Sequence, residues 1–411
     1  MKYTSKKVTE QQSLYAIISA PLNPLIVLLM SAATGLTVAS NYYAQPLLNS
    51  IGAQFGLPIT TAGSIVTVAQ FSYAIGLILL VPLGDMVERK TLIVIMTILS
   101  ACGLLITAFA SNIFFVIFGT AIAGVLSVMA QIMIPFASDL ALAHERGKVV
   151  GTIMSGLLMG ILLARTAAGF LADLGSWRTV YWVAATLMFA MAYALWLALP
   201  RFKTPITQNY LRILTSIFYL YRDEPLFRAR SMLGAILFAS FSLFWTSLTF
   251  LLTNPPYEYS TTVIGLFGLA GIAGAYAAKK FGSLADLGYG NRTTVVGLLL
   301  LLISWIPVAL GQNSIITLLI GVVMLDLAIQ GVHVTNLSAI YRLNSGARSR
   351  LTSGIMTANF IGASAGSIIS SWVFVNNGWY GICLVGVAMA VVALIYAFFA
   401  SNIHIPKKLL P

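Results

Sequence analysis

The sequence has very little charge. Of its 411 residues only 8% are Asp, Glu, Lys or Arg, whereas about a quarter are charged in an ordinary soluble domain. Hydrophobic residues make up 59%, and the mean hydropathy is +0.93. A soluble chain of this length would need two or three domains, whose surfaces so few charged side chains could not cover. The composition therefore excludes a soluble enzyme and a disordered chain, and it predicts a polytopic membrane protein.

Cysteine and histidine are also scarce, which bears on metal and redox chemistry. The two cysteines, Cys102 and Cys383, lie inside apolar runs far apart in the sequence. We interpret them as buried thiols rather than a disulfide or a metal site. The sequence has no metal-ligand cluster, phosphate-binding loop or nucleotide-binding motif. We therefore expect no bound metal, no cofactor and no ATP-driven pumping by this chain alone.

Long apolar runs are what the sequence has in abundance. A membrane-spanning helix needs about 20 mostly apolar residues, and the runs are continuously apolar, without the alternation of a barrel strand. They predict an all-α membrane protein with twelve transmembrane helices. The expected spans cover residues 23–43, 61–83, 91–110, 113–136, 149–171, 179–199, 229–252, 260–281, 293–311, 314–340, 351–374 and 379–400.

The basic residues orient these spans. A net charge of +12 would suggest a nucleic-acid partner for a soluble protein, but here Lys and Arg gather in alternate loops. If the N-terminus is cytoplasmic, every Lys and Arg except Arg165 and Arg178 lies in a cytoplasmic segment, as the positive-inside rule requires. We therefore expect no nucleic-acid partner, and we expect both termini in the cytoplasm.

The two halves of the chain match each other at an offset of 202 residues. The coincident positions are Arg146 and Lys148 with Arg348 and Arg350, Gly160 with Gly362, and Trp177 with Trp379. Equivalent helices run in the same direction, so the repeat is parallel, as in transporters that rock about a site at the membrane midplane. We expect an N-terminal six-helix bundle over 1–200, a cytoplasmic linker over 201–228 and a C-terminal six-helix bundle over 229–411.

Twelve spans, a basic central loop and the loop at residues 84–90 (GDMVERK) resemble the major facilitator superfamily over nearly the whole chain. In that family the charges of this loop latch the cytoplasmic side of the outward-open state. The resemblance implies a gating role for Asp85, Arg89 and Lys90, and for Asp286 and Arg292 in a weaker second copy. The alternative is a solvated charged turn that only fixes the topology.

Three further segments resemble bacterial drug:proton antiporters within this superfamily. They are residues 41–48, residues 156–160 followed by Arg165, and residues 326–333. The sequence also departs from that branch, because the fifth span has no Gly-Pro pair and Thr120 stands where the fourth span usually carries Arg. The resemblance implies a transporter of the bacterial inner membrane, and the departures count against multidrug export.

Only three ionisable residues lie deep within the expected spans, namely Arg165, Asp326 and His333. A charge at the centre of a membrane helix costs about 2.5–3.5 kcal/mol, so each marks a candidate functional site. Asp326, Gln330 and His333 share one face of one helix, with His333 about 10 Å further along its axis. We expect Asp326 to couple transport to protons, with His333 as a relay or substrate ligand. Alternatively, Asp326 is a static partner of Arg165 or of a backbone amide.

Arg165 has two interpretations that the sequence does not separate. Its guanidinium could clamp a carboxylate or phosphate of the substrate, or it could be neutralised by Asp326. Gln131 is the repeat counterpart of His333, which favours one shared cavity. Polar and aromatic residues on the other cavity helices complete the candidate substrate pocket: Asn41, Tyr42, Gln45, Gln131, Phe241 and Trp245.

The predicted function is secondary active transport by alternating access, without an enzymatic reaction. Proton-coupled efflux of small amphipathic organic compounds by a monomer is the first interpretation. The second is proton-coupled carriage of an organic anion, such as a polycarboxylate or siderophore, with Arg165 as the clamp. A remote alternative is an intramembrane serine hydrolase, because residues 362–366 match the Gly-x-Ser-x-Gly pattern. Small residues at such spacing usually indicate close helix packing instead.

Overall fold

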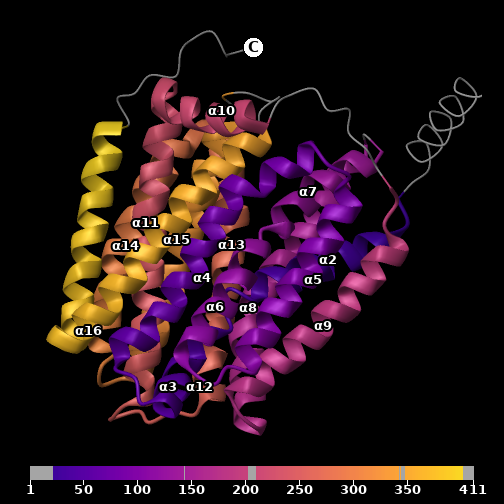
Figure 1. The fold of residues 1–411 in the computed structure, drawn as a ribbon. Coiled ribbons are helices and arrows are strands. Elements are labelled where there is room, and N and C mark those ends of the chain that lie inside the picture. The colour runs from indigo at the N-terminus through magenta and orange to yellow at the C-terminus, as the bar shows by residue number, and fades with distance from the viewer. Residues whose placement is uncertain (1–21, 143, 202–209, 342, 344–347, 401–411) are drawn as a thin grey trace, which may run out of the picture.

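The computed structural model describes residues 22–142, 144–201, 210–341, 343 and 348–400, and this part of the chain is helical without strands (Figure 1). The helices of the first half are α2 (Pro24–Ala39), α3 (Ala44–Phe55), α4 (Ile59–Leu79), α5 (Arg89–Ala108), α6 (Ile113–Leu126), α7 (Met129–Leu140), α8 (Arg146–Leu174) and α9 (Trp177–Ala198). Those of the second half are α10 (Tyr210–Asp223), α11 (Pro225–Thr253), α12 (Thr261–Leu266), α13 (Gly271–Leu284), α14 (Gly290–Leu310), α15 (Ile315–Tyr341) and α16 (Arg348–Ala400). An all-α membrane fold is confirmed.

The helices coincide with the twelve expected apolar runs. Ten helices among the described residues are long and apolar enough to cross a membrane. One of these, α16, contains the last two expected spans, which meet at Gly378 with a φ of 61°. The expected span at 260–281 is broken into α12, a short 3-10 turn (Phe267–Ala270) and α13.

Local sequence explains several helix ends. The side chain of Asn23 accepts a hydrogen bond from the backbone of Leu25, and Pro24 occupies the first turn of α2, where its missing N–H costs nothing. Asn112 and Ser260 cap α6 and α12 in the same way. At Gly56 a φ of 63° ends α3, which glycine adopts without strain.

The bundle has two distinct ends in Figure 1. Helix α10 lies across one end, which we call the α10 end. Helices α3 and α12 lie at the opposite end, which we call the α3 end. The hydroxyl of Tyr221 on α10 donates to the carbonyl of Gly354 on α16, and that of Tyr210 donates to the carbonyl of Leu79 on α4. Helix α10 therefore ties elements of both sequence halves together at its end.

Two helix pairs join the sequence halves through close backbone contact. Between α8 and α12, a side chain on Gly169 would overlap the carbonyl of Thr261, and one on Gly265 would overlap that of Arg165. Helix α4 contacts α16, where the hydroxyls of Thr67 and Ser367 lie 2.6 Å apart. Small residues permit this approach, as is common between membrane helices.

Candidate functional site

A break in the first membrane helix begins the candidate site. Residues 40–43 form turns between α2 and α3, so the α-helical hydrogen bonds are interrupted there. Tyr42 lies in the break and Gln45 in the first turn of α3, and both are buried. The carbonyl of Gln45 accepts a hydrogen bond from the hydroxyl of Thr249 on α11, at 2.9 Å. The break therefore places two candidate site residues where α3 meets α11 of the second half of the chain.

Arg165 on α8 lies at the centre of the site and is only 3% exposed. Its Nε donates to Gln45 Oε1 at 2.5 Å. Its guanidinium carbon lies 4.0 Å from the ring centre of Trp245, 4.9 Å from that of Tyr42 and 5.5 Å from that of Phe241. Aromatic faces stabilise a cation by their quadrupole, most strongly when water is excluded. The Nη2 atom of Arg165 has no hydrogen-bond partner among the described residues.

Trp245 on α11 stands between Arg165 and Asp326. Its ring contacts the guanidinium, and its Nε1 donates to Asp326 Oδ1 at 3.2 Å. Among the described side chains, Arg89 pairs with Asp139 and Arg222 with Asp223, and no ion pair joins Arg165 to Asp326. Arg165 and Asp326 therefore interact through the indole and across a short gap, without a direct ion pair.

Asp326 on α15 is 4% exposed, and it is the one buried acidic residue among those whose burial is described. Burial of a carboxylate is costly unless it is paired or protonated. Gly271 leaves room beside it, since a side chain there would meet Leu162 of α8 and approach Asp326 Oδ2. Gln330 follows one turn later, half-buried and close to Gly274.

His333 lies in a separate cluster further along α15. Its Nδ1 is 3.5 Å from Nδ2 of Asn359 on α16, and its ring contacts Phe238 of α11 with centres 5.2 Å apart. Phe238 contacts Phe360, which packs on Tyr73 at 4.2 Å. Gln131 donates to the hydroxyl of Tyr73 at 3.3 Å, so a chain of rings joins Gln131 to His333 across the two halves.

The structure thus divides the candidate pocket residues into two groups. The first group surrounds the guanidinium of Arg165 and consists of Tyr42, Gln45, Phe241 and Trp245, with Asp326 joined to it through Trp245. Gln131 and His333 belong to the ring cluster, which Phe238 connects to Phe241 at 6.3 Å. The side chain of Asn41 hydrogen-bonds to neither group: its amide donates to the hydroxyl of Ser127 at 2.8 Å, and its Oδ1 has no partner among the described residues.

The expected gating residues are only partly described. Arg89 is buried and donates from Nε to the carbonyl of Gly84 at 2.7 Å and from Nη1 to Asp139 Oδ2 at 2.6 Å. Lys90 is half-buried, and Arg292 is exposed with its guanidinium over the ring of Tyr289. The side chains of Asp85 and Asp286 lie outside the described part, so the roles of these five residues stay predictions.

Breaking the Arg89–Asp139 pair is expected to destabilise the protein. Arg89→Gln removes the buried cation, so the carboxylate of Asp139 and the carbonyl of Gly84 lose their charged hydrogen-bond donor. We expect the free energy of unfolding to fall by about 1–3 kcal/mol. Arg222→Gln is the matched control, because Arg222 and Asp223 are both largely exposed and such pairs contribute about 0–1 kcal/mol. Thermal unfolding in detergent measures both, and equal shifts would contradict the assignment.

The hydrolase alternative is not supported by the geometry. Ser364 donates to the carbonyl of Phe360 within its own helix, at 2.7 Å. Gly362 and Gly366 lie against the carbonyls of Ala235 and Ala239, so they serve the close packing of α16 on α11. Within the described ranges, no group of three His, Cys, Asp or Glu side chains could hold a metal ion.

Several residues of the site were not found from the sequence. Asp139 ends an apolar run and looks like a loop residue, although it holds Arg89. Asn359 and Gln70 are buried polar side chains in expected spans, but neither shares a helix face with a deep ionisable residue, which is what selected Gln330. Gln70 of α4 donates to Ser242 of α11 at 3.2 Å.

The chain is similar to known transporters. The model of the Major Facilitator Superfamily matches residues 30–295. A putative uncharacterized transporter of Escherichia coli (strain K12), YgaY, is 54% identical over 374 residues, which cover 91% of this chain and 95% of that protein. The inner membrane transport protein YnfM of the same organism is 27% identical over 288 residues, 68% of each chain. A bacterial homologue of the human lysosomal transporter Spinster, solved inward-facing and unoccupied, has a TM-score of 0.76 at 16% identity, covering 93% of this chain and 98% of that one.

Proposed function

Because the chain belongs to the Major Facilitator Superfamily and is a membrane transporter rather than an enzyme, we propose that it exports small amphipathic organic compounds in exchange for protons. The exchange proceeds by alternating access, with the site at Arg165 and Asp326 open to one side at a time. A monomer in the inner membrane, with its bundles over 1–200 and 229–411 rocking against each other, suffices for this cycle.

One observation carries the proposal: Asp326 is buried without a direct cationic partner. Its single hydrogen bond among the described residues comes from Trp245, which is a neutral donor. A carboxylate in this position gains from binding a proton when water is excluded and from losing it when the site is hydrated. Asp326 therefore changes protonation as the site opens and closes, and His333, one cluster further along α15, serves as a relay.

The surroundings of Arg165 support an amphipathic substrate. Three aromatic rings and one amide line the guanidinium, and such rings bind flat organic molecules by stacking. A substrate that stacks on Trp245 would displace the guanidinium or the indole N–H bond to Asp326. Substrate and proton would then compete for the same few side chains, which is the requirement for exchange.

The close packing of α8 on α12 supports a conformation closed at the α3 end. We assign the α10 end to the cytoplasm, together with both termini, because the basic loops lie there. Beyond the glycine contacts, Asp173 of α8 accepts a hydrogen bond from the backbone of Thr262 at 2.8 Å. The structure then represents an inward-facing or occluded state. The loop at 84–90 would latch the opposite state through contacts other than the Arg89–Asp139 pair, which is already formed in this one.

A second candidate is carriage of an organic anion. The observation that favours it is the unpartnered Nη2 of Arg165, a buried donor that a carboxylate of the substrate would satisfy. In this version Arg165 holds the substrate directly, and Asp326 again carries the proton.

Proton flux in proteoliposomes distinguishes the two candidates. With a lumenal pH dye, cationic amphipathic drugs and polycarboxylates are added in turn to the wild type and to Arg165→Gln. Export by antiport predicts proton movement with the amphipathic compounds, which Arg165→Gln weakens without abolishing, since the three rings remain. Responses to polycarboxylates alone, lost in Arg165→Gln, would establish the anion carrier instead. No response to either class would contradict both.

A further inference from the structure

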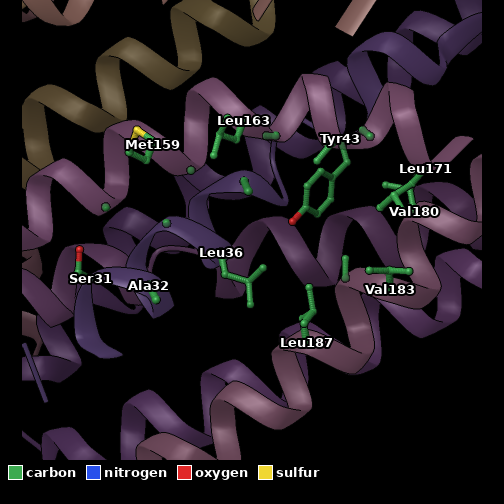
Figure 2. Close-up of a pocket in the computed structure, with 18 of the residues that line it drawn as sticks. Ser31, Ala32, Leu36, Tyr43, Met159, Leu163, Leu171, Val180, Val183 and Leu187 are labelled. Carbon is green, nitrogen blue, oxygen red and sulfur yellow. The ribbon is translucent and has the colours of Figure 1, made fainter. Parts of the chain in front are cut away.

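A second cavity lies outside the site at Arg165, on the other side of the first membrane helix. It is a groove lined by α2, α8 and α9 with a volume of about 380 Å³ (Figure 2). This is within the size range of small-molecule pockets, about 300–1,000 Å³. Its lining is aliphatic or small, and only Ser31 and Tyr43 contribute polar side chains. The hydroxyl proton of Ser31 is already used, because it is donated to the carbonyl of Thr152 at 2.8 Å, so this side chain can only accept a further hydrogen bond.

The cavity opens toward the hydrocarbon of the membrane. Four of its lining side chains are between 45% and 61% exposed, and all are apolar: Leu28, Met159, Leu163 and Leu187. In a membrane protein such exposed aliphatic side chains on spanning helices face lipid rather than water. A ligand would therefore enter this groove from within the bilayer.

The floor of the groove is built from glycine. Side chains on Gly35 of α2 and on Gly160 of α8 would each overlap the backbone of the facing helix. The two helices cross at this point without intervening side chains, which leaves the space above the crossing empty. The floor of the groove is thus fixed by close backbone packing, and side chains form only its walls.

The hydroxyl of Tyr43 lacks a partner and points into the groove. Figure 2 shows its oxygen directed into the space bordered by Leu36 and Leu187. The residue is only 6% exposed, and its hydroxyl makes no hydrogen bond with any residue in the described part of the chain. A hydroxyl without a partner in an apolar groove leaves its hydrogen-bonding capacity unsatisfied, which favours a ligand that pairs with it. Its neighbour Tyr42 faces Arg165 on the opposite side of the helix break.

We propose that this groove binds an uncharged lipophilic molecule with a single hydrogen-bonding oxygen, which pairs with the hydroxyl of Tyr43. A plain acyl chain would fill the volume but leave the hydroxyl unpaired. A charged ligand would find no opposite charge in the lining. A medium-chain alcohol has the matching chemistry, with an apolar body for the aliphatic walls and one oxygen for Tyr43. The site does not depend on proton coupling at Asp326, so its test needs no transport.

Photolabelling tests this site directly. The full-length protein in lipid nanodiscs is exposed to octanol carrying a diazirine, and labelled residues are identified by mass spectrometry. We expect saturable labelling of groove residues such as Leu36, Met159 and Leu187, displaced by unlabelled octanol. Tyr43→Phe keeps the ring and removes the hydroxyl. It should weaken apparent affinity about 2- to 10-fold, the equivalent of one hydrogen bond. Tyr193→Phe, at an exposed tyrosine of α9 outside the groove, is the matched control.

Filling the groove is the complementary test. Ala167 of α8 and Ala32 of α2 are exposed and line the cavity, so Ala167→Phe and Ala32→Phe fill it from two helices without disturbing the core. Both should abolish saturable labelling, whereas Ala190→Phe at an exposed position of α9 outside the lining should not. Equal displacement by octane and octanol, or unchanged labelling in Tyr43→Phe, would overturn the proposal and leave a groove for acyl chains.

Discussion

Replacing Asp326 with asparagine is expected to abolish proton movement in proteoliposomes while leaving substrate exchange intact. The amide has the same shape and still accepts the hydrogen bond that Trp245 donates at 3.2 Å, but it does not ionise between pH 4 and 9. The site therefore keeps its geometry and loses its proton acceptor. The rate of lumenal pH change that the pH dye reports should equal that of protein-free liposomes. The rate of counterflow of labelled substrate should stay within about twofold of the wild type.

Two further variants make this result specific. Trp245→Phe removes the indole donor and keeps an aromatic face for Arg165, so it should alter the pH at which transport is half-maximal while preserving coupling. His333→Gln tests the relay, and it should slow proton movement less than Asp326→Asn. Proton flux that survives in Asp326→Asn would reduce this residue to a structural role.

Replacing Gly169 with alanine is expected to open the α3 end of the transporter. In Gly169→Ala the new methyl group overlaps the carbonyl of Thr261 across the contact of α8 with α12. Because the obstacle is backbone, the helices must separate, and overpacking of this kind costs about 1–3 kcal/mol. We expect a lower unfolding temperature and a population shift toward the state open at this end.

Spin labels report this shift. Cysteines at Ser111 and Asn376 place one label in each half at the α3 end, at exposed positions. Their separation should increase in Gly169→Ala. Gly151→Ala on the same helix is the matched control, because nothing lies within 4 Å of the added methyl group, and it should be neutral or stabilising. An unchanged distance in Gly169→Ala would mean that this contact does not close the transporter.

The membrane fold could be predicted from the sequence because its cause is local. Each span is an apolar run of about 20 residues, and the hydrophobic thickness of the bilayer dictates that length. The ends of the helices and the breaks within them were harder to predict from the sequence. The expected spans 351–374 and 379–400 flank Gly378, but the sequence does not show that they join in one helix kinked there. Likewise, the first expected span ends at residue 43, whereas the structure continues it as α3 beyond the break at residues 40–43.

The candidate site could be predicted in part, for a different reason. Ionisable residues are so costly in a membrane that Arg165 and Asp326 could be selected individually, and both lie at the same site. The position of Trp245 between Arg165 and Asp326 could not be predicted, because it depends on how α8, α11 and α15 pack. The same holds for His333, which shares a helix face with Asp326 but lies in the ring cluster with Phe238 and Asn359.

Accumulation of substrate driven by a pH gradient tests the central claim most directly. Proteoliposomes are loaded with buffer that is more acidic inside than outside, and a compound that evoked proton flux is supplied at equal concentration on both sides. Exchange of substrate for protons predicts uptake against the developing substrate gradient, abolished by a protonophore and absent in Asp326→Asn. Equilibration without accumulation, unaffected by the protonophore, would contradict proton-coupled antiport.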